Sequence, residues 1–405
     1  MRKTRYVLVG AGDRGREMFA KPLVEDWKEV ADFVGICDPN PVRAQFISRE
    51  CGDIPCYQDF DKMLSETEPD FVIVTTPDSL HHYYIIKAME AGCNAISEKP
   101  MTTDAEKCRA ILDAERRTGK KAIVTFNCRF DPYIVRIKQL LAEGAIGDIL
   151  SVHMQWSLDT RHGADYFRRW HSSMAMSGGL LVHKSTHHFD MINWWLDDEP
   201  LHVYADGGRY FYGPTREQRG ERCLTCSYKD SCEFYMDIMK DRFKREFYVS
   251  GEPFDGYVRD KCVFSEDIDI YDTMSLSVKY SRGALLSYSL NAYSPYEGWK
   301  VTLVGTQGRL EAQATSDPLI DAGSHQFIHV FNHGSEHMTV KMRKATGSHG
   351  GSDALLRKML FEQRGADPLR QMAGSREGAM SLLIGASANI SIAEKRRVDV
   401  KDQLI

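Results

Sequence analysis

The sequence lacks several features that would each assign it to a class of protein. It has no apolar run of the about 20 residues that a membrane-spanning helix needs, so a membrane protein is not expected. Its formal net charge is -5 at pH 7 and it carries no nucleic-acid-binding motif, which argues against nucleic acid or an anionic membrane as a partner. The 10 cysteines are too few for a disulfide scaffold and fit a reducing cytoplasm. Met1-Arg2-Lys3 leads directly into a short strand rather than into a signal peptide, so a cytoplasmic location is expected.

The length and composition are those of an ordinary two-domain protein. A chain of 405 residues is too long for one hydrophobic core. Apolar residues make up 42% of it and charged residues 27%, as in most soluble proteins. The patterns described below place a first domain at residues 1–127 and a second at residues 128–405.

A glycine-rich motif follows the first expected strand, at residues 6–9. It reads Gly10-Ala11-Gly12-Asp13-Arg14-Gly15, and a helix is expected after it. Gly10 permits a tight turn, Gly12 lets the backbone approach a pyrophosphate, and Gly15 allows close packing of the helix on the strand. The free N–H groups at the start of the helix then face the phosphates. This arrangement predicts a dinucleotide-binding Rossmann domain whose contacts include Asp13 and Arg14.

The second expected strand, residues 33–37, ends at Asp38. A carboxylate about 20 residues beyond the glycines accepts hydrogen bonds from the adenosine ribose hydroxyls and repels a 2′-phosphate. The sequence therefore favours NAD over NADP as the cofactor. Arg43, just over one helical turn further on, is the one nearby feature that favours NADP.

Strands and helices continue to alternate through the first domain, which predicts a parallel sheet with ligands at the carboxyl ends of its strands. The expected strands are at 70–77, 94–97 and 122–126, and the expected helices at 59–66, 80–91 and 104–118. Six residues lie at or just beyond strand ends: Thr76, Pro77, Asp78, His81, Glu98 and Lys99. All of them except Asp78 are expected to contact the cofactor. Lys99 closely follows an apolar strand, and Pro100 stiffens the turn after it. We expect Lys99 to be functional rather than a plain surface lysine.

Two histidines stand four residues apart in the segment 178–195, which begins with a pair of glycines and is expected to be helical beyond them. Residues at this spacing share one face of a helix, so His183 and His187 are expected to lie side by side. Asp190, three residues beyond, is placed to hold the imidazole of His187. The pair suits proton transfer near neutral pH. A metal site and a purely structural role in the core are the alternatives.

Taken together, these motifs resemble those of the Gfo/Idh/MocA family of sugar and cyclitol dehydrogenases. The residues that carry the resemblance are the glycine motif, Thr76-Pro77 with His81, Glu98-Lys99-Pro100, residues 127–132 with Arg129, and residues 144–148. The family pattern in the second domain is a glycine pair, an Asp, a His four residues later and another Asp three beyond. His187 and Asp190 match it, whereas His183 occupies the position of the first Asp. The resemblance implies that His187 is the catalytic base, with His183 as a competitor or partner, and that Lys99 is also catalytic.

The second domain is expected to be α+β, with a large, open and mainly antiparallel sheet. Alternating strands are expected at 150–158, 203–211, 274–280, 284–292, 300–305 and 309–314, followed by covering helices at 354–363 and 377–393. The resemblance implies that the open face makes a homodimer or homotetramer. Cationic and aromatic residues of the segment 165–171, namely Arg169, Trp170 and His171, suit contact with a sugar. We add Arg129, His183 and His187 to these as substrate-binding candidates.

An insertion at about residues 213–262 contains four of the cysteines, Cys223, Cys226, Cys232 and Cys262. A C-x2-C pair with two further thiols predicts a structural zinc site that would stabilise a long loop without a core. An iron–sulfur cluster fits the spacing less well, and free thiols are the remaining alternative.

The sequence thus predicts an NAD-dependent dehydrogenase that oxidises a secondary hydroxyl of a pyranoside or cyclitol. A histidine would take the hydroxyl proton while Lys99 stabilises the oxygen. One alternative is a redox glycosidase that retains its NAD through the reaction. The other is a non-catalytic dinucleotide-binding regulator, against which Lys99 and the histidine pair both argue.

Overall fold

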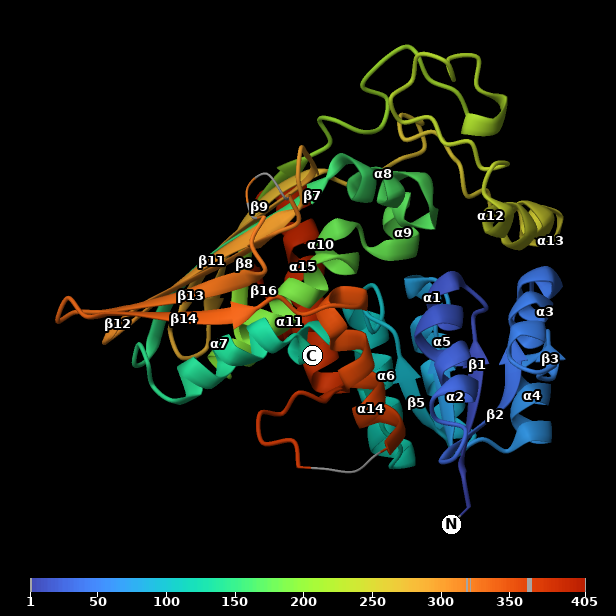
Figure 1. The fold of residues 1–405 in the computed structure, drawn as a ribbon, viewed down its shortest axis with the longest axis horizontal. Helices are drawn as coiled ribbons and strands as arrows, with labels where there is room; N and C mark the ends of the chain where they lie inside the picture. The colour runs from blue at the N-terminus through green and yellow to red at the C-terminus, as the bar shows by residue number, and fades with distance from the viewer. Residues whose placement is uncertain (1, 318–319, 321, 363–365, 405) are drawn as a thin grey trace.

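The fold consists of two sheets from two adjoining domains (Figure 1). It is described by a computed structural model for residues 2–317, 320, 322–362 and 366–404. The expected fold class is confirmed, because the first sheet is mostly parallel and the second is open and mainly antiparallel.

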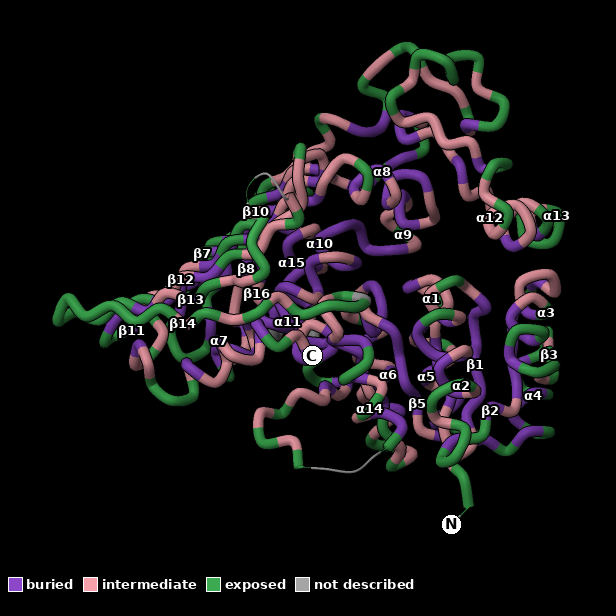
Figure 2. The backbone as a smooth tube through the Cα atoms, in the orientation of Figure 1, coloured by how far each residue is buried: buried purple, intermediate pink, exposed green. Residues whose placement is uncertain are grey.

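The first sheet forms the core of the N-terminal domain. Its described strands, in spatial order, are β15 (Ala373–Gly374), β6 (Ala122–Val124), β5 (Asn94–Ser97), β4 (Phe71–Val74), β1 (Thr4–Val9), β2 (Ala31–Cys37) and β3 (Cys56–Tyr57). β1 to β6 run parallel, and β15 runs antiparallel to β6. The central strands are apolar on both faces because helices cover both, so they are buried in Figure 2.

Helices connect these strands at nearly the expected positions. They are α1 (Asp13–Gly15), η1 (Arg16–Ala20), α2 (Lys21–Glu25), α3 (Pro41–Glu50), α4 (Phe60–Thr67), η2 (Asp78–Leu80), α5 (His81–Glu90) and α6 (Ala105–Thr118). The side chain of Asn40 caps α3, and those of Asp59 and Asp104 cap α4 and α6. The Lys99–Pro100 peptide bond, in the loop after β5, is cis.

The second sheet has one long row of strands. In spatial order the described strands are β14 (His337–Arg343), β13 (His325–Asn332), β12 (Gly308–Thr315), β11 (Gly298–Gly305), β7 (Ile149–Asp159), β10 (Leu285–Ser294), β9 (Thr273–Tyr280), β8 (Pro200–Gly208) and β16 (Val398–Asp399). The pair β7–β10 is parallel, and the other pairs are antiparallel. All six predicted strands are present, but β13, β14 and β16 were not predicted.

Helices cover one face of this sheet and leave the other open. The covering layer consists of α7 (Pro132–Ala142), α10 (Leu180–His183), α11 (Ser185–Leu196) and α15 (Ser375–Glu394), with α15 packed on β8 and on α11. Strands such as β9 alternate buried and exposed residues, and the exposed ones form the green outer face in Figure 2. The segments η3 (Asn127–Phe130), α8 (Thr160–Arg168), η4 (Trp170–Ser172) and α9 (Met174–Ser177) lie at the junction with the first domain.

Two expectations about helices are corrected. The helix expected up to residue 195 is broken at Lys184, which separates α10 from α11. The helix expected at 354–363 does not cover the second sheet. It is α14 (Ser352–Glu362), and it packs on the first domain, where the ring of Phe361 lies 5.3 Å from that of Tyr6. Its buried residues Leu356 and Leu360 join the same first-domain core, which explains its apolar face.

The insertion forms a separate layer that extends from the second domain toward the first (Figure 1). It contains only short helices, η5 (Cys223–Thr225), α12 (Arg242–Phe247), η6 (Val249–Gly251) and α13 (Glu252–Asp255). Two further short turns, η7 (Ser348–Gly351) and η8 (Lys401–Leu404), complete the described elements. Among the helices of the described residues, none combines the length and apolar character needed to cross a membrane.

Candidate active site

The glycine motif forms a turn whose geometry explains each glycine. Gly10 has a φ of +93°, and a Cβ there would lie 2.6 Å from the backbone of Thr75 and Thr76. A Cβ on Gly15 would lie 2.6 Å from the Thr75 hydroxyl. A Cβ on Gly12 would have no atom within 4 Å, so the Gly12 backbone faces open space. The turn therefore fits a dinucleotide pyrophosphate, which needs an open, side-chain-free approach at the middle glycine.

Asp38 lies at the carboxyl end of β2 and is buried. Its Oδ2 accepts a hydrogen bond from Ala11 N at 2.7 Å, and its Oδ1 accepts one from Asn40 N at 2.7 Å. Burial raises its pKa, while Arg43 and these backbone donors oppose the rise. The carboxylate thus joins the glycine turn to the start of α3, at the position where a ribose would be bound.

The other cofactor candidates divide into exposed and supporting residues. Asp13 is exposed at the start of α1, and Thr76 and Pro77 are half-buried in the loop after β4. Arg14 donates to Glu98 Oε1 at 2.7 Å and to Asp353 Oδ2 at 3.2 Å, so it ties three segments together. His81 is buried, and its ring nitrogens lie 2.8 Å from the carbonyl oxygens of Thr76 and Pro100. His81 therefore supports the two strand-end loops instead of facing the cofactor space.

A cluster of three side chains lies where the two domains meet. Lys99 Nζ is 3.4 Å from His183 Nε2 and donates to the His183 carbonyl at 3.1 Å, just before the break at Lys184. On the other side of the same ring, His183 Nδ1 is 2.5 Å from Asp78 Oδ2. The side chains of His183 and Asp78 are only 10% and 3% exposed. Lys99, His183 and Asp78 thus form one continuous chain of contacts across the domain junction.

Burial controls the protonation of this cluster. It lowers the pKa of Lys99 to about 8, although the carboxylates of Asp78 and Glu98 oppose the change. It also holds the pKa of His183 and His187 well below the usual value, with Lys99 lowering both further. The pKa of Asp78 is raised well above its usual value, again by burial and against the effect of Lys99. The histidines are consequently neutral near pH 7 and able to accept a proton.

His187 lies within the electrostatic reach of Lys99 but does not contact Asp190 as expected. Its Nδ1 is buried without a hydrogen-bond partner among the described residues, and its ring packs against Phe126 at 6.0 Å. Asp190 instead accepts from Arg129 Nε at 2.8 Å and from Arg129 Nη2 at 2.7 Å. The expected support of His187 by Asp190 is therefore wrong, because Arg129 engages both oxygens of that carboxylate.

The same pair corrects the expectation that Arg129 binds substrate. The side chains of Arg129 and Asp190 are 4% and 1% exposed. Arg129 Nη1 also donates to the carbonyl of Arg370 at 2.9 Å, so the guanidinium is engaged on all sides by the protein. Arg129 fastens η3 to α11 and to the C-terminal part of the chain, which is a structural role.

The segment 165–171 does reach the cluster. The His171 ring lies 4.2 Å from that of His183 and stacks on Trp170 at 3.6 Å. Arg169 Nη2 forms an ion pair with Asp165 Oδ2 at 2.9 Å, and the guanidinium lies over the Tyr166 ring. These residues build a wall of rings and one cation beside His183. Asp78 and Tyr166, whose ring is 5.4 Å from that of His183, are the participants to which sequence reasoning gave no catalytic or substrate role.

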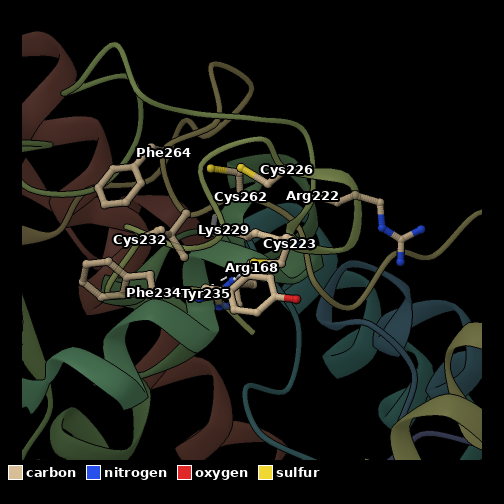
Figure 3. Close-up of a pocket in the computed structure, with 11 residues that line it drawn as sticks. Arg168, Arg222, Cys223, Cys226, Lys229, Cys232, Phe234, Tyr235, Cys262 and Phe264 are labelled. Carbon is tan, nitrogen blue, oxygen red and sulfur yellow. Dashed lines mark hydrogen bonds between the residues drawn. The ribbon is translucent and has the colours of Figure 1, made fainter. Parts of the chain in front are cut away.

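The four cysteines of the insertion converge on one small pocket, shown in Figure 3. Arg168 Nη1 donates to Cys223 Sγ at 3.2 Å, and Arg216 Nη2 to Cys232 Sγ at 3.5 Å. All four thiols are free, and over the described part of the chain no three His, Cys, Asp or Glu side chains are arranged to hold a metal ion. The convergence agrees with the spacing argument, but the zinc site is not supported, because the four sulfurs are not arranged as metal ligands in the described residues.

Fold and site together define an oxidoreductase with a dinucleotide-binding Rossmann domain and a second domain that completes the active site. The family description "Oxidoreductase family, NAD-binding Rossmann fold" matches residues 4–126, and "GFO/IDH/MocA C-terminal domain" matches residues 134–311. The chain belongs to the Gfo/Idh/MocA family.

Several relatives illustrate the range of this family. YteT of Bacillus subtilis (strain 168), named as an oxidoreductase, is 38% identical over 98% of this chain and 97% of its own. An inositol 2-dehydrogenase of Rhizobium meliloti (strain 1021) is 31% identical over 50% of this chain and 57% of its own. The fold is similar to that of a levoglucosan dehydrogenase solved with NADH and levoglucosan, with a TM-score of 0.70, 19% identity, and coverage of 98% of this chain and 100% of that one.

Proposed function

We propose that the protein is an NAD-dependent dehydrogenase that oxidises a secondary hydroxyl on the ring of a pyranoside or cyclitol. The observation that carries this proposal is the chain of contacts from Lys99 through His183 to Asp78, which both domains build together. The inositol dehydrogenase among the relatives supports a polyol ring as the substrate class. The rings of Trp170 and His171 would cover its C–H faces, and Arg169 would bond its hydroxyls.

The proposed reaction takes a hydride from a carbinol carbon and a proton from its oxygen, leaving a ketone. When bound, NAD supplies the hydride acceptor. Gly10, Gly12 and Gly15 would receive its pyrophosphate at the turn before α1, and Asp38 its adenosine ribose. Asp13, Thr76 and Pro77 would contact the cofactor along the same approach, and Glu98 accepts a hydrogen bond from Arg14.

Lys99 and His187 would act directly on the substrate oxygen. The Lys99 ammonium donates a hydrogen bond to it and stabilises the negative charge that develops as the proton leaves. His187, kept neutral by burial, accepts that proton. His183 has one ring nitrogen beside Asp78 and the other beside Lys99, so it aims the ammonium and holds it in place. A lysine loses most of its conformational freedom when two neighbouring groups fix its end, which favours catalysis.

The test is a screen of pyranosides and inositols for NAD reduction, followed by absorbance of the reduced nicotinamide. At least one ring polyol is expected to support steady turnover, and His187→Ala and Lys99→Ala should each lower its kcat by roughly 10²-fold. NAD affinity, measured separately by calorimetry, should change little in His187→Ala. Full activity of both variants would show that this cluster is only packed core.

We also infer that the open face of the second sheet pairs with another copy of the chain. Outward-facing apolar side chains on it include Tyr204, Leu285, Phe327 and Phe331, which are 52%, 54%, 43% and 37% exposed. Between them the face carries mostly small polar side chains, so a second sheet can approach closely. Light scattering on the purified protein should give a dimer or tetramer, and Leu285→Arg with Phe331→Arg should lower that mass. A monomeric wild type would refute this.

A further inference from the structure

The insertion, residues 213–262, is attached to both domains. On the second domain, Arg259 Nη2 donates to Asp165 Oδ1 at 2.6 Å, and Arg168 Nη1 donates to the Lys261 carbonyl at 3.2 Å. On the first domain, α12 packs against α3 through Phe46, whose ring lies 5.2 Å from that of Phe247. The insertion therefore spans the domain junction on the side of α3 (Figure 1).

A second set of contacts places the insertion beside the expected adenosine ribose. Asn40, the residue that caps α3, donates through Nδ2 to the Gly251 carbonyl at 2.9 Å. The Gly251 position is tight, because a Cβ there would lie 3.0 Å from Asn40 Nδ2. Asn40 also donates its backbone N–H to Asp38. Asn40 thus connects Gly251, at the end of η6, to the Asp38 carboxylate that would bind the ribose.

Arg43 is the decisive residue, since a nearby arginine is what accommodates the 2′-phosphate of NADP. Its Nη2 hydrogen-bonds to Asp255 Oδ2, at the end of α13, and lies 3.5 Å from Asp38 Oδ1. The three side chains are shielded, with 11% of Arg43, 7% of Asp38 and 19% of Asp255 exposed. Tyr257, with its ring centroid 6.0 Å from the guanidinium, flanks the same group. The Arg43 guanidinium is therefore held between two carboxylates.

We propose that Asp255, contributed by the insertion, is a cofactor-selectivity residue that makes the ribose end prefer NAD over NADP. If Asp38 were the only carboxylate beside Arg43, the guanidinium would have N–H groups left to donate hydrogen bonds to the 2′-phosphate of NADP. Asp255 accepts a hydrogen bond from Arg43 and adds a second negative charge. A 2′-phosphate would have to displace this carboxylate from Arg43 and would also be repelled by its charge. This inference rests on the NAD assignment in the proposed function and adds a residue from outside the Rossmann domain.

Calorimetric titration with NAD and with NADP, in the absence of any sugar, tests this directly. Asp255→Asn keeps the shape and the acceptor for Tyr257 N but removes the charge. Its NADP affinity should rise at least tenfold relative to NAD. Glu246→Gln is the matched control, because it removes the same charge from an exposed pair with Arg242 on α12. The control and Asp255→Glu should both keep the wild-type ratio.

The gain must also depend on Arg43. Adding Arg43→Met to Asp255→Asn should return NADP binding to the wild-type level or below. An unchanged NADP-to-NAD ratio in Asp255→Asn, or an equal change in Glu246→Gln, would overturn the inference while leaving the proposed function intact. A wild type that binds neither dinucleotide would overturn both. Thermal melts of each variant without ligand separate loss of binding from loss of folding.

Discussion

Asp78 Oδ2 of the first domain lies 2.5 Å from His183 Nδ1 of the second, so a buried hydrogen bond joins the two domains at the candidate active site. The family pattern places an Asp where this chain has His183. Here a carboxyl group lies against the His183 ring from another element, the start of η2 after β4. The carboxyl group that the pattern supplies within one helix is thus supplied across the domain junction, with an imidazole between it and Lys99.

Removing the charge of Asp78 should weaken catalysis without weakening cofactor binding. Asp78→Asn keeps an oxygen that can accept from His183 but no longer favours a protonated His183 Nδ1. The tautomer with an unprotonated Nε2 facing Lys99 is then less favoured, and kcat should fall by roughly tenfold or more. Asp61→Asn, which removes the partner of Lys87 on the surface, is the control and should leave kcat unchanged. Wild-type kcat and pH profile in Asp78→Asn would contradict this role.

The pH dependence should reflect Lys99. Because burial lowers its pKa from 10.5 to about 8, the ammonium is lost as the pH rises through about 8. The kcat/KM on the true substrate should therefore fall above about pH 8, because the Lys99 ammonium no longer donates a hydrogen bond to the substrate oxygen. Lys99→Arg should move the fall to higher pH, since a guanidinium stays charged. Burial lowers the pKa of His187, so its imidazole stays neutral at pH values well below 6.5. The enzyme should therefore remain active at those acidic pH values. Activity that rises through pH 8 would instead make Lys99 the base.

The glycine turn offers a test that separates binding from folding. Gly12 has a φ of -87° and open space at its Cβ position, so Gly12→Ala should change stability by less than about 1 kcal/mol. The added methyl group would stand where the pyrophosphate approaches, and NAD affinity should fall by about tenfold or more. Gly10→Ala should instead destabilise the fold, because of its φ of +93° and the 2.6 Å contact with Thr75. Equal NAD binding by wild type and Gly12→Ala would place the cofactor elsewhere.

Short-range patterns predicted much of this molecule, and contacts made at long range were the part that could not be predicted. The glycine turn, Asp38 and Lys99 each follow a strand directly, so the parallel sheet fixes their place. The partner of Asp190 could not be found in this way, because Arg129 approaches from a different segment and competes with His187 for the carboxylate. The position of α14 was missed for a similar reason. The apolar face of α14 predicts that the helix packs against a core, but it does not indicate whether that core belongs to the first or the second sheet.

The position of the insertion also lay beyond sequence reasoning. Its cysteines were the visible feature, yet the contacts that reach the expected cofactor come from Gly251 and Asp255, which belong to no motif. Even for the cysteines, spacing predicted that they would meet but not that Arg168 and Arg216 would face their sulfurs.

Arg129 should behave as a structural residue. Arg129→Met leaves the Asp190 carboxylate buried and unpaired, which should lower the free energy of unfolding by about 3–5 kcal/mol. Arg2→Met removes an ion pair whose side chains are 68% and 39% exposed, and it should cost less than about 1 kcal/mol. Urea denaturation of both variants makes the comparison. A stable Arg129→Met with a raised KM would restore Arg129 as a substrate contact.

The proposed function rests on the transfer of a hydride from a ring carbinol to the nicotinamide. The most direct test uses the substrate found in the screen, carrying deuterium on the reacting carbon, with mass spectrometry of the cofactor after one turnover. We expect deuterium in the reduced nicotinamide and a ketone product, with both formed roughly 10²-fold more slowly in Lys99→Ala. Deuterium that returns to the sugar while a glycosidic bond is broken would identify a redox glycosidase. Failure of every ring polyol to label the cofactor, in protein shown to bind NAD, would contradict the account.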